Sequence, residues 1–299
     1  MARILQSPQY SSFRLQKRIK TTKPKLPSTK ALCQQTVQIL KGNKKFFAIF
    51  TILYGVLTFV FIQSSVSTID LAEAQRLIGN NLGALPTSLV LYSGLLTNSI
   101  QVSSQIAALY QFVLILIFSL AVIYGLRHMY GKQARKVGVK ESLYKGMTPL
   151  IPILLVLAVV ALQLLPMSLG TSIYSTVINA GLAVTGIERM VWLVFMLLLA
   201  LLTLYMISSS LFALFIVTLP NMTPMRALRA SRELVRFRRL EVIRKLILLP
   251  LILLILLGIV VVPFIAFLPA AAQPVFFVAS ALVLPTVLTY LYNLYRSML

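Results

Sequence analysis

The chain has almost none of the side chains on which enzymes and metal sites depend. Its 299 residues include six Asp or Glu, one His and one Cys. The single thiol, Cys33, excludes an intrachain disulfide and has no neighbours at metal-ligand spacing. Charged residues make up 11% of the chain, against about 25% in a soluble domain. None of the acids lies in the middle of an apolar run; they are Asp70, Glu73, Glu141, Glu188, Glu233 and Glu241.

Motifs for hydrolysis, phosphoryl transfer and metal binding are also missing. The sequence has no G-x-x-x-x-G-K-[ST], no H-E-x-x-H and no paired-cysteine motif. Catalysis in a membrane needs carboxylates, histidines, metal ligands or a nucleophile with its base. Glu141 and His128 are the one acid–imidazole pair within a single connection, and a lone His at a span end is most often an interfacial side chain. We therefore expect a protein that is not an enzyme and that uses no cofactor and no metal.

Long apolar runs are what the sequence has in abundance, since 59% of its residues are hydrophobic. Crossing a bilayer core of about 30 Å takes roughly 20 apolar residues. The runs predict an all-α polytopic membrane helix bundle with about six transmembrane helices. They lie at 46–62, 106–126, 150–165, 190–218, 246–267 and 275–295. Residues 167–187 are expected to be a connection outside the third span.

Lys and Arg are distributed very unevenly around these spans. All of them except Arg76 and Arg189 fall on one side. The positive-inside rule therefore predicts that both termini are cytoplasmic. Residues 1–27 are basic, contain proline and lack apolar periodicity, which predicts a disordered cytoplasmic tail. Residues 28–299 are expected to form a single integral-membrane helical domain.

The connection at 63–105 is the only long external segment that this topology predicts. A short amphipathic helix is expected within it, from the spacing of Ile69, Ala72, Leu77 and Ile78. Isolated polar residues also occur within the predicted spans. Ser and Thr in a span more often bond a backbone carbonyl than a substrate. These polar positions are Gln163, Ser208, Ser209, Ser210 and Thr289.

A strongly basic segment runs directly into the fifth span, with eight Lys or Arg between residues 226 and 245. At about 100° per residue it predicts an amphipathic helix, with Thr223 as its N-cap and Pro224 at its first position. The apolar side comprises Ala227, Leu228, Ser231, Leu234, Val235 and Val242, and the polar side Arg226, Arg229, Arg232, Glu233 and Arg236. Arginine enters the apolar face at 237–240, which predicts a bend before the span.

The same pattern precedes the first span. The stretch "PSTKALCQQTVQILKGNKKFFAIFTIL" aligns with "TPMRALRASRELVRFRRLEVIRKLILL" 196 residues later. Gly42-Asn43, a pair that commonly ends helices, falls opposite Arg238-Arg239. A weaker third copy is "VGVKESLYKGMTPLIPILL", whose Met-Thr-Pro recurs at 222–224. Each copy predicts a basic amphipathic helix followed by an outward-going span.

Clustered positive charge of this kind predicts a partner with negative charge. Each Lys or Arg near an anionic membrane surface contributes about 1 kcal/mol of attraction. We expect the helix before the fifth span to lie in the inner headgroup layer with its arginines facing phosphates; a cytoplasmic or membrane protein partner is the alternative. Nucleic acid is not expected, because stacking aromatics are not interleaved with the arginines. The candidate lipid- or partner-facing residues are Arg226, Arg229, Arg232, Arg236, Arg238, Arg239, Lys41, Lys44 and Lys45.

The segment "ALRASRELVRFRRLEVIRKLILL" resembles a pattern of bacterial inner-membrane proteins. These are the YciC-type proteins and the membrane domain attached to some glycerophosphoryl diester phosphodiesterases. The family usually has Trp near the start of this segment and after its bend, whereas this chain has Glu233 and residues 237–240 there. The resemblance implies a six-helix inner (plasma) membrane protein with an accessory role in membrane organisation or envelope assembly. The catalytic domain of the fused members has no counterpart here.

A second functional class remains open. The stretch Ala227-Leu228-Arg229-Ala230-Ser231-Arg232 is similar to the Ala-Arg coupling motifs in membrane subunits of energy-coupling transporters. That similarity implies a transporter subunit whose cytoplasmic helices couple to an ATPase or another partner.

Overall fold

The computed structural model describes residues 26–61, 84–100, 105–130, 138–219 and 222–299. Every regular element in these ranges is an α-helix, and six helices are long and apolar enough to cross a membrane. The predicted all-α class with six such helices is confirmed. They are α2 (Lys44–Phe61), α5 (Gln105–Met129), α7 (Leu150–Asn179), α8 (Gly186–Ser210, continued by α9, Ala213–Ile216), α11 (Arg239–Phe267) and α12 (Pro269–Arg296).

Two predictions fall on the rest of the chain. Residues 1–25 of the predicted tail lie outside the described residues. So does the predicted amphipathic helix with Ile69, Ala72, Leu77 and Ile78.

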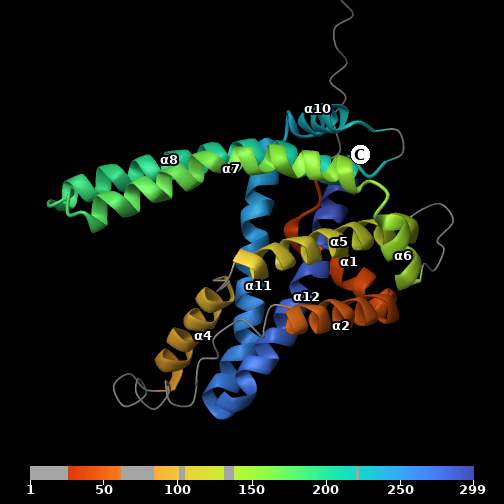
Figure 1. Ribbon diagram of the computed structural model, residues 1–299, viewed down its shortest axis with the longest axis horizontal. Coiled ribbons are helices and arrows are strands. Elements are labelled where there is room, and N and C mark those ends of the chain that lie inside the picture. Colours follow the sequence, from red (N-terminus) through yellow and green to blue (C-terminus); the bar gives the residue numbers. More distant parts are fainter. Residues whose placement is uncertain (1–25, 62–83, 101–104, 131–137, 220–221) are drawn as a thin grey trace, which may run out of the picture.

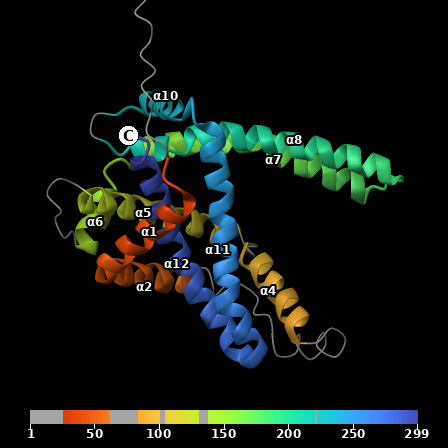
Figure 2. The ribbon, with the colours of Figure 1, turned by 180° about the vertical axis from the view of Figure 1, so that it is seen from behind.

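Among the six long helices, α7 packs along α8 and α11 along α12, while α2 and α5 contact each other and both contact α12. Figure 1 shows that α7 and α8 run side by side across the view and extend away from the rest of the molecule, whereas α11 and α12 run from top to bottom. The same crosswise arrangement is seen from behind in Figure 2. The α7–α8 pair therefore runs crosswise to the α11–α12 pair.

Three short helices each precede one long helix in the chain. They are α1 (Thr29–Gly42) before α2, α6 (Val139–Gly146) before α7, and α10 (Pro224–Val235) before α11. The predicted breaks are confirmed, because α1 ends at Gly42 and α11 begins at Arg239, after a turn. The two Met-Thr-Pro stretches occupy different places in the fold, since Pro149 is the N-cap of the long α7 whereas Pro224 is the first residue of the short α10.

The third long helix corrects the prediction that its span ends at residue 165. α7 continues through Pro166 to Asn179 and takes in most of the expected connection at 167–187. Its hydroxyl groups bond carbonyls of their own helix, as Ser168 Oγ does to Leu165 O at 2.9 Å, so they do not break it. α8 packs along α7, and Gly170 brings the two helices together, since a Cβ at that position would lie 3.1 Å from Leu199 Cδ1.

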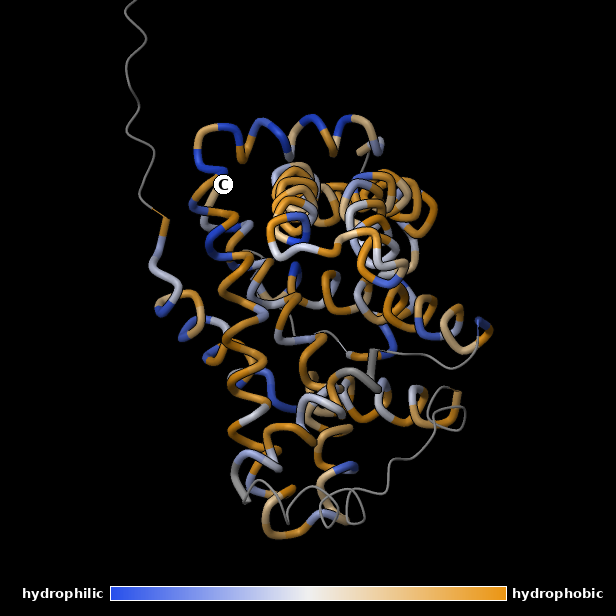
Figure 3. The backbone as a smooth tube through the Cα atoms, turned by 90° about the vertical axis from the view of Figure 1, so that its left-hand side faces the viewer, coloured by the Kyte–Doolittle hydropathy of each residue, from blue (hydrophilic) through white to orange (hydrophobic). Residues whose placement is uncertain are grey.

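The largest buried core lies where the short helices meet the ends of the long ones. It contains Leu32 of α1, Val235 of α10, Val242 of α11 and Leu294 of α12, all almost fully buried. The far ends of α7 and α8, by contrast, expose apolar side chains, as Ile187 does with 79% of its surface. Figure 3 shows hydrophobic residues along the long helices and hydrophilic ones concentrated on α10. The helices α7 and α8 are therefore anchored at one end and expose apolar side chains at the other.

The helix α4 (Ala84–Ile100) packs alongside α11. Leu91, Tyr92 and Leu95 are buried in a second core with residues of α11 and α12. The hydroxyl of Tyr92 donates a 2.8 Å hydrogen bond to the carbonyl of Leu254. This apolar stretch is thus part of the helical domain.

Candidate functional site at the basic junctions

The amphipathic helix predicted from residue 224 is α10, and its two faces are as predicted. Pro224 is the first helical residue, and Thr223 holds the extended backbone of an N-cap. The buried face consists of Ala227, Leu228, Ser231 and Val235. This face packs against α7, α8 and α9, so protein contacts hold α10 in place. The arginine face points away from that base.

The predicted lipid- or partner-facing residues fall into two groups in space. Figure 1 separates α10, at the top of the view, from the α1–α2 joint that carries the lysines. Seven of the nine residues are exposed: Arg226, Arg229, Arg232, Arg236, Lys41, Lys44 and Lys45. Arg238 and Arg239 are half-buried at the start of α11. The arginines of α10 therefore form one surface and the lysines another.

Arg239 is held against the protein and does not point into solvent. Its guanidinium carbon lies 4.4 Å from the centre of the Tyr205 ring on α8. Such a cation–π contact contributes about 0.5–1 kcal/mol at an exposed site and more when buried. This contact makes Arg239 a link between α11 and α8, in addition to its place in the basic segment.

A buried hydrogen bond joins each short helix to a long helix other than the one that directly follows it in the chain. The hydroxyl of Ser142 on α6 donates a 2.6 Å hydrogen bond to the carbonyl of Ala121 on α5. Ser231 of α10 donates a short hydrogen bond to the carbonyl of Ser209 on α8. On α1 the acceptor is the hydroxyl of Thr36, which receives a 3.1 Å bond from the Asn293 amide of α12.

These contacts connect the three helix-plus-span units in a closed order. α6 of the second unit docks on α5, the long helix that follows the first unit. In the same way α10 of the third unit docks on α8, which follows the second, and α1 of the first unit docks on α12, which follows the third. The predicted physical repeat therefore extends to how each short helix is anchored. A small hydroxyl residue on the apolar face of each short helix was the sequence signal for these anchors.

Lys245 is a buried residue among the eight Lys or Arg between residues 226 and 245, and it was not one of the predicted lipid- or partner-facing residues. Only 3% of its surface is exposed, and its ammonium donates a 2.7 Å hydrogen bond to the carbonyl of Pro27. Pro27 stands just before α1, whereas Lys245 lies on the first turns of α11. The bond therefore ties the first unit to the third, and its partner 218 residues away could not be read from local sequence.

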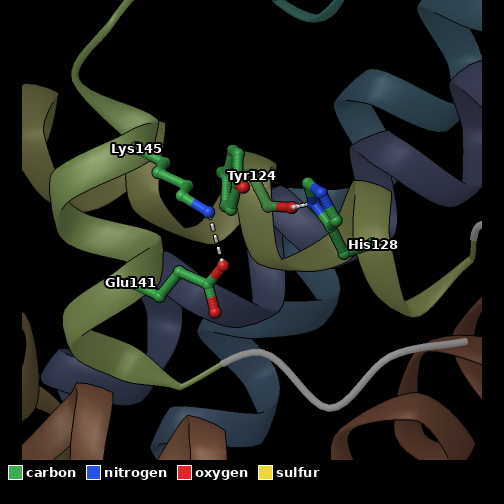
Figure 4. A network of polar contacts seen from close by, with 4 residues as sticks. All are labelled: Tyr124, His128, Glu141 and Lys145. Atoms are coloured by element: carbon green, nitrogen blue, oxygen red, sulfur yellow. Dashed lines mark hydrogen bonds and ion pairs between the residues drawn. The ribbon is translucent and has the colours of Figure 1, made fainter.

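The acid–imidazole pair considered in the sequence does not assemble. Figure 4 shows Glu141 directed toward Lys145, with the Lys145 ammonium 2.8 Å from the carboxylate. The Nδ1 atom of His128 lies 3.0 Å from the carbonyl of Tyr124 on its own helix. Figure 4 draws both side chains and shows no hydrogen bond between His128 and Glu141. Each side chain is thus engaged within its own helix.

Four of the five polar positions predicted within the long helices bond the backbone of their own helix, whereas the fifth, Gln163, has a buried Oε1 for which the described residues supply no hydrogen-bond partner. Ser208, Ser209 and Ser210 donate to the carbonyls of Tyr205 and Met206 on the same helix. Thr289 likewise donates to the carbonyl of Pro285 at 2.7 Å. Within the described part of the chain, no three His, Cys, Asp or Glu side chains come together as a metal site would need.

The basic junctions present cationic groups on a base of packed helices. Guanidinium groups bind phosphates and carboxylates through charge-assisted, often bidentate hydrogen bonds. The exposed cationic groups of the basic junctions therefore suit ligands that carry phosphate or carboxylate groups. No protein-family model, curated protein or solved structure matches the chain.

Proposed function

We propose that this protein is an integral plasma-membrane protein that is not an enzyme and that binds anionic lipid headgroups through the arginine face of α10. Its role is accessory, in membrane organisation or envelope assembly, and both termini lie in the cytoplasm. One observation carries the proposal: Arg226, Arg229, Arg232 and Arg236 are exposed while the opposite face of α10 is buried in the protein.

The energetics favour headgroups as the ligand of this face. Each arginine near an anionic surface contributes about 1 kcal/mol, so four on one helix give several kcal/mol of attraction. Packing against α7, α8 and α9 fixes α10 before it binds, which removes the cost of ordering the helix. The attraction is electrostatic, so it weakens as salt shortens the screening length from about 10 Å at 0.1 M to about 3 Å at 1 M.

Electron paramagnetic resonance of spin-labelled lipids tests this proposal on the full chain in bilayers. The fraction of each lipid immobilised at the protein gives its selectivity for phosphatidylglycerol over phosphatidylcholine. We expect selectivity in the wild type, most of it lost in the R229Q/R232Q/R236Q variant and retained in the charge-matched R229K/R232K/R236K variant. Equal selectivity in all three proteins, or selectivity unchanged by 1 M salt, would refute the role of α10.

A membrane subunit of a transporter is the second candidate, and the packing of α10 favours it. α10 contacts the long helices α7 and α8 and leads directly into α11. A partner that moved α10 would therefore move two helix pairs. If an ATPase encoded beside this chain co-purifies with it, and R229Q/R232Q/R236Q abolishes that complex while lipid selectivity persists, the transporter function replaces the lipid-binding one.

A further inference from the structure

An open apolar groove lies between α2 and α12, far from α10. Its volume is about 320 Å³, within the range of small-molecule and cofactor sites. Except for Thr51, every residue that lines it is apolar. The lining consists of Thr51, Ile52, Gly55, Val56 and Phe59 of α2 with Phe277, Val278 and Ala281 of α12.

Small residues and a ring pair give the groove its shape. A Cβ at Gly55 would lie 3.9 Å from both Ala281 Cβ and the Phe277 ring. Because Gly55 has no side chain, the groove is deeper at this position. The rings of Phe59 and Phe277 meet edge to face with their centres 6.0 Å apart and limit the groove at its outer end. The side chain of Val278 forms part of the rim and is 60% exposed.

Two lysines stand on the same face of α2 at its other end. Residues seven apart lie on one helix face, which aligns Lys44 with Thr51 and Lys45 with Ile52. The separation along the axis is roughly 10 Å, from a rise of 1.5 Å per residue. Both lysines are exposed, and neither forms an ion pair with any residue that the structure describes.

We propose that this groove binds one acyl chain of an anionic phospholipid whose phosphate is held by Lys44 and Lys45. This inference rests on the proposed function, because both take anionic lipid as the ligand. The groove site, however, is a different surface from the arginine face of α10. α2 has 18 residues, so it spans about 27 Å, close to the roughly 30 Å hydrocarbon core. Placing the lysines at headgroup level then puts the groove at acyl-chain depth.

A phospholipid fits this arrangement better than a helix of another protein. Its charge lies at one end and its apolar chain extends from that end, which is the order of lysines and groove along α2. Basic residues beside spans recognise anionic headgroups in the same manner. A second copy of this chain is the competing occupant, and its signature is a dimer.

Native mass spectrometry of the detergent-purified full chain tests the charged end of the site. The probes are phosphatidylglycerol and phosphatidylcholine with identical acyl chains, added to delipidated protein. We expect one tightly held phosphatidylglycerol per chain. K44Q/K45Q should reduce the preference for phosphatidylglycerol by up to about thirtyfold, while K44R/K45R should retain it, because each lysine adds about fivefold.

The apolar part of the site is tested by filling the groove. V278W, and independently V56W, should weaken retention of both lipids regardless of headgroup. L198W is the matched control, since Leu198 is 59% exposed on α8 and lies outside the groove. Thermal unfolding of each variant verifies that it is folded.

The outcomes separate this site from the α10 surface. If K44Q/K45Q leaves the preference unchanged, or both groove-filling variants retain lipid like L198W, the groove site is refuted. Loss of selectivity in R229Q/R232Q/R236Q alone would leave the proposed function standing without the groove. A wild-type dimer that V278W dissociates, with no lipid retained, would assign the groove to a second copy and overturn the inference.

Discussion

The hydroxyl of Ser142 on α6 lies 2.6 Å from the carbonyl oxygen of Ala121 on α5, and both partners are buried. This bond spans 21 residues of sequence, and the Ser231–Ser209 bond between α10 and α8 spans 22. Two short basic helices are thus anchored by the same chemistry at nearly the same spacing. The arginine face of α10 is held in place in part by the Ser231 anchor.

Replacing either serine by alanine should destabilise the protein by about 1 kcal/mol. A buried interhelical hydrogen bond contributes on this order, and the variants S142A and S231A each remove one donor. Unfolding in mixed detergent measures the change. S175A is the control, because Ser175 is exposed and bonds Ser172 within its own helix. Equal stability of S231A and S175A would mean that α10 does not depend on its anchor.

Close backbone contact between α6 and α5 should make Gly146 intolerant of a side chain. A Cβ there would lie 3.1 Å from Ala121 Cα and 3.2 Å from Leu120 O, which are backbone atoms that cannot move aside singly. We expect G146A to cost about 1–3 kcal/mol, as overpacking does. G42A is the comparison, since a Cβ at Gly42 meets nothing within 4 Å. A neutral G146A would show that α6 can separate from α5 at no cost.

The distribution of basic residues predicts which ends of the helices face the cytoplasm. Val184, in the turn between α7 and α8, is 80% exposed, and Met225, at the start of α10, is 66% exposed. In a C33S background, V184C should react with an impermeant maleimide in intact cells, and M225C only after permeabilisation. The reverse result would invert the orientation.

Native Cys33 is a poor reporter for the same experiment, which is why it is replaced. Burial raises the pKa of the Cys33 thiol, because desolvation disfavours the thiolate. Little of the reactive thiolate is then present at neutral pH, and its fraction rises only as the pH approaches the raised pKa. In permeabilised cells, Cys33 of the wild type should therefore label more slowly than M225C at neutral pH, and the difference should shrink as the pH increases.

Local patterns were sufficient to identify the six long helices and the polarity of α10. The length and hydrophobicity of the apolar runs identified six membrane-length helices. Lipid offers no hydrogen-bond partner to the backbone, so an apolar run that crosses a membrane forms a helix, which pairs its own N–H and C=O groups. The 100° spacing separated Val235 from Arg236 on α10, and the Gly42-Asn43 pair marked the end of α1, because both depend only on neighbouring residues. The exposure of the α10 arginines followed from the same periodicity.

Tertiary structure decided what depends on residues distant in sequence. α7 continues past Pro166 with α8 packed along it, and local propensity says nothing of such a partner. Lys245 carries the same charge as exposed Arg244, yet it is buried because the Pro27 carbonyl 218 residues away accepts its hydrogen bond. The groove between Gly55 and Ala281 likewise exists only once α2 and α12 meet. Helix formation is set within a few residues along the chain, whereas burial and cavities are set by which surfaces the fold brings together.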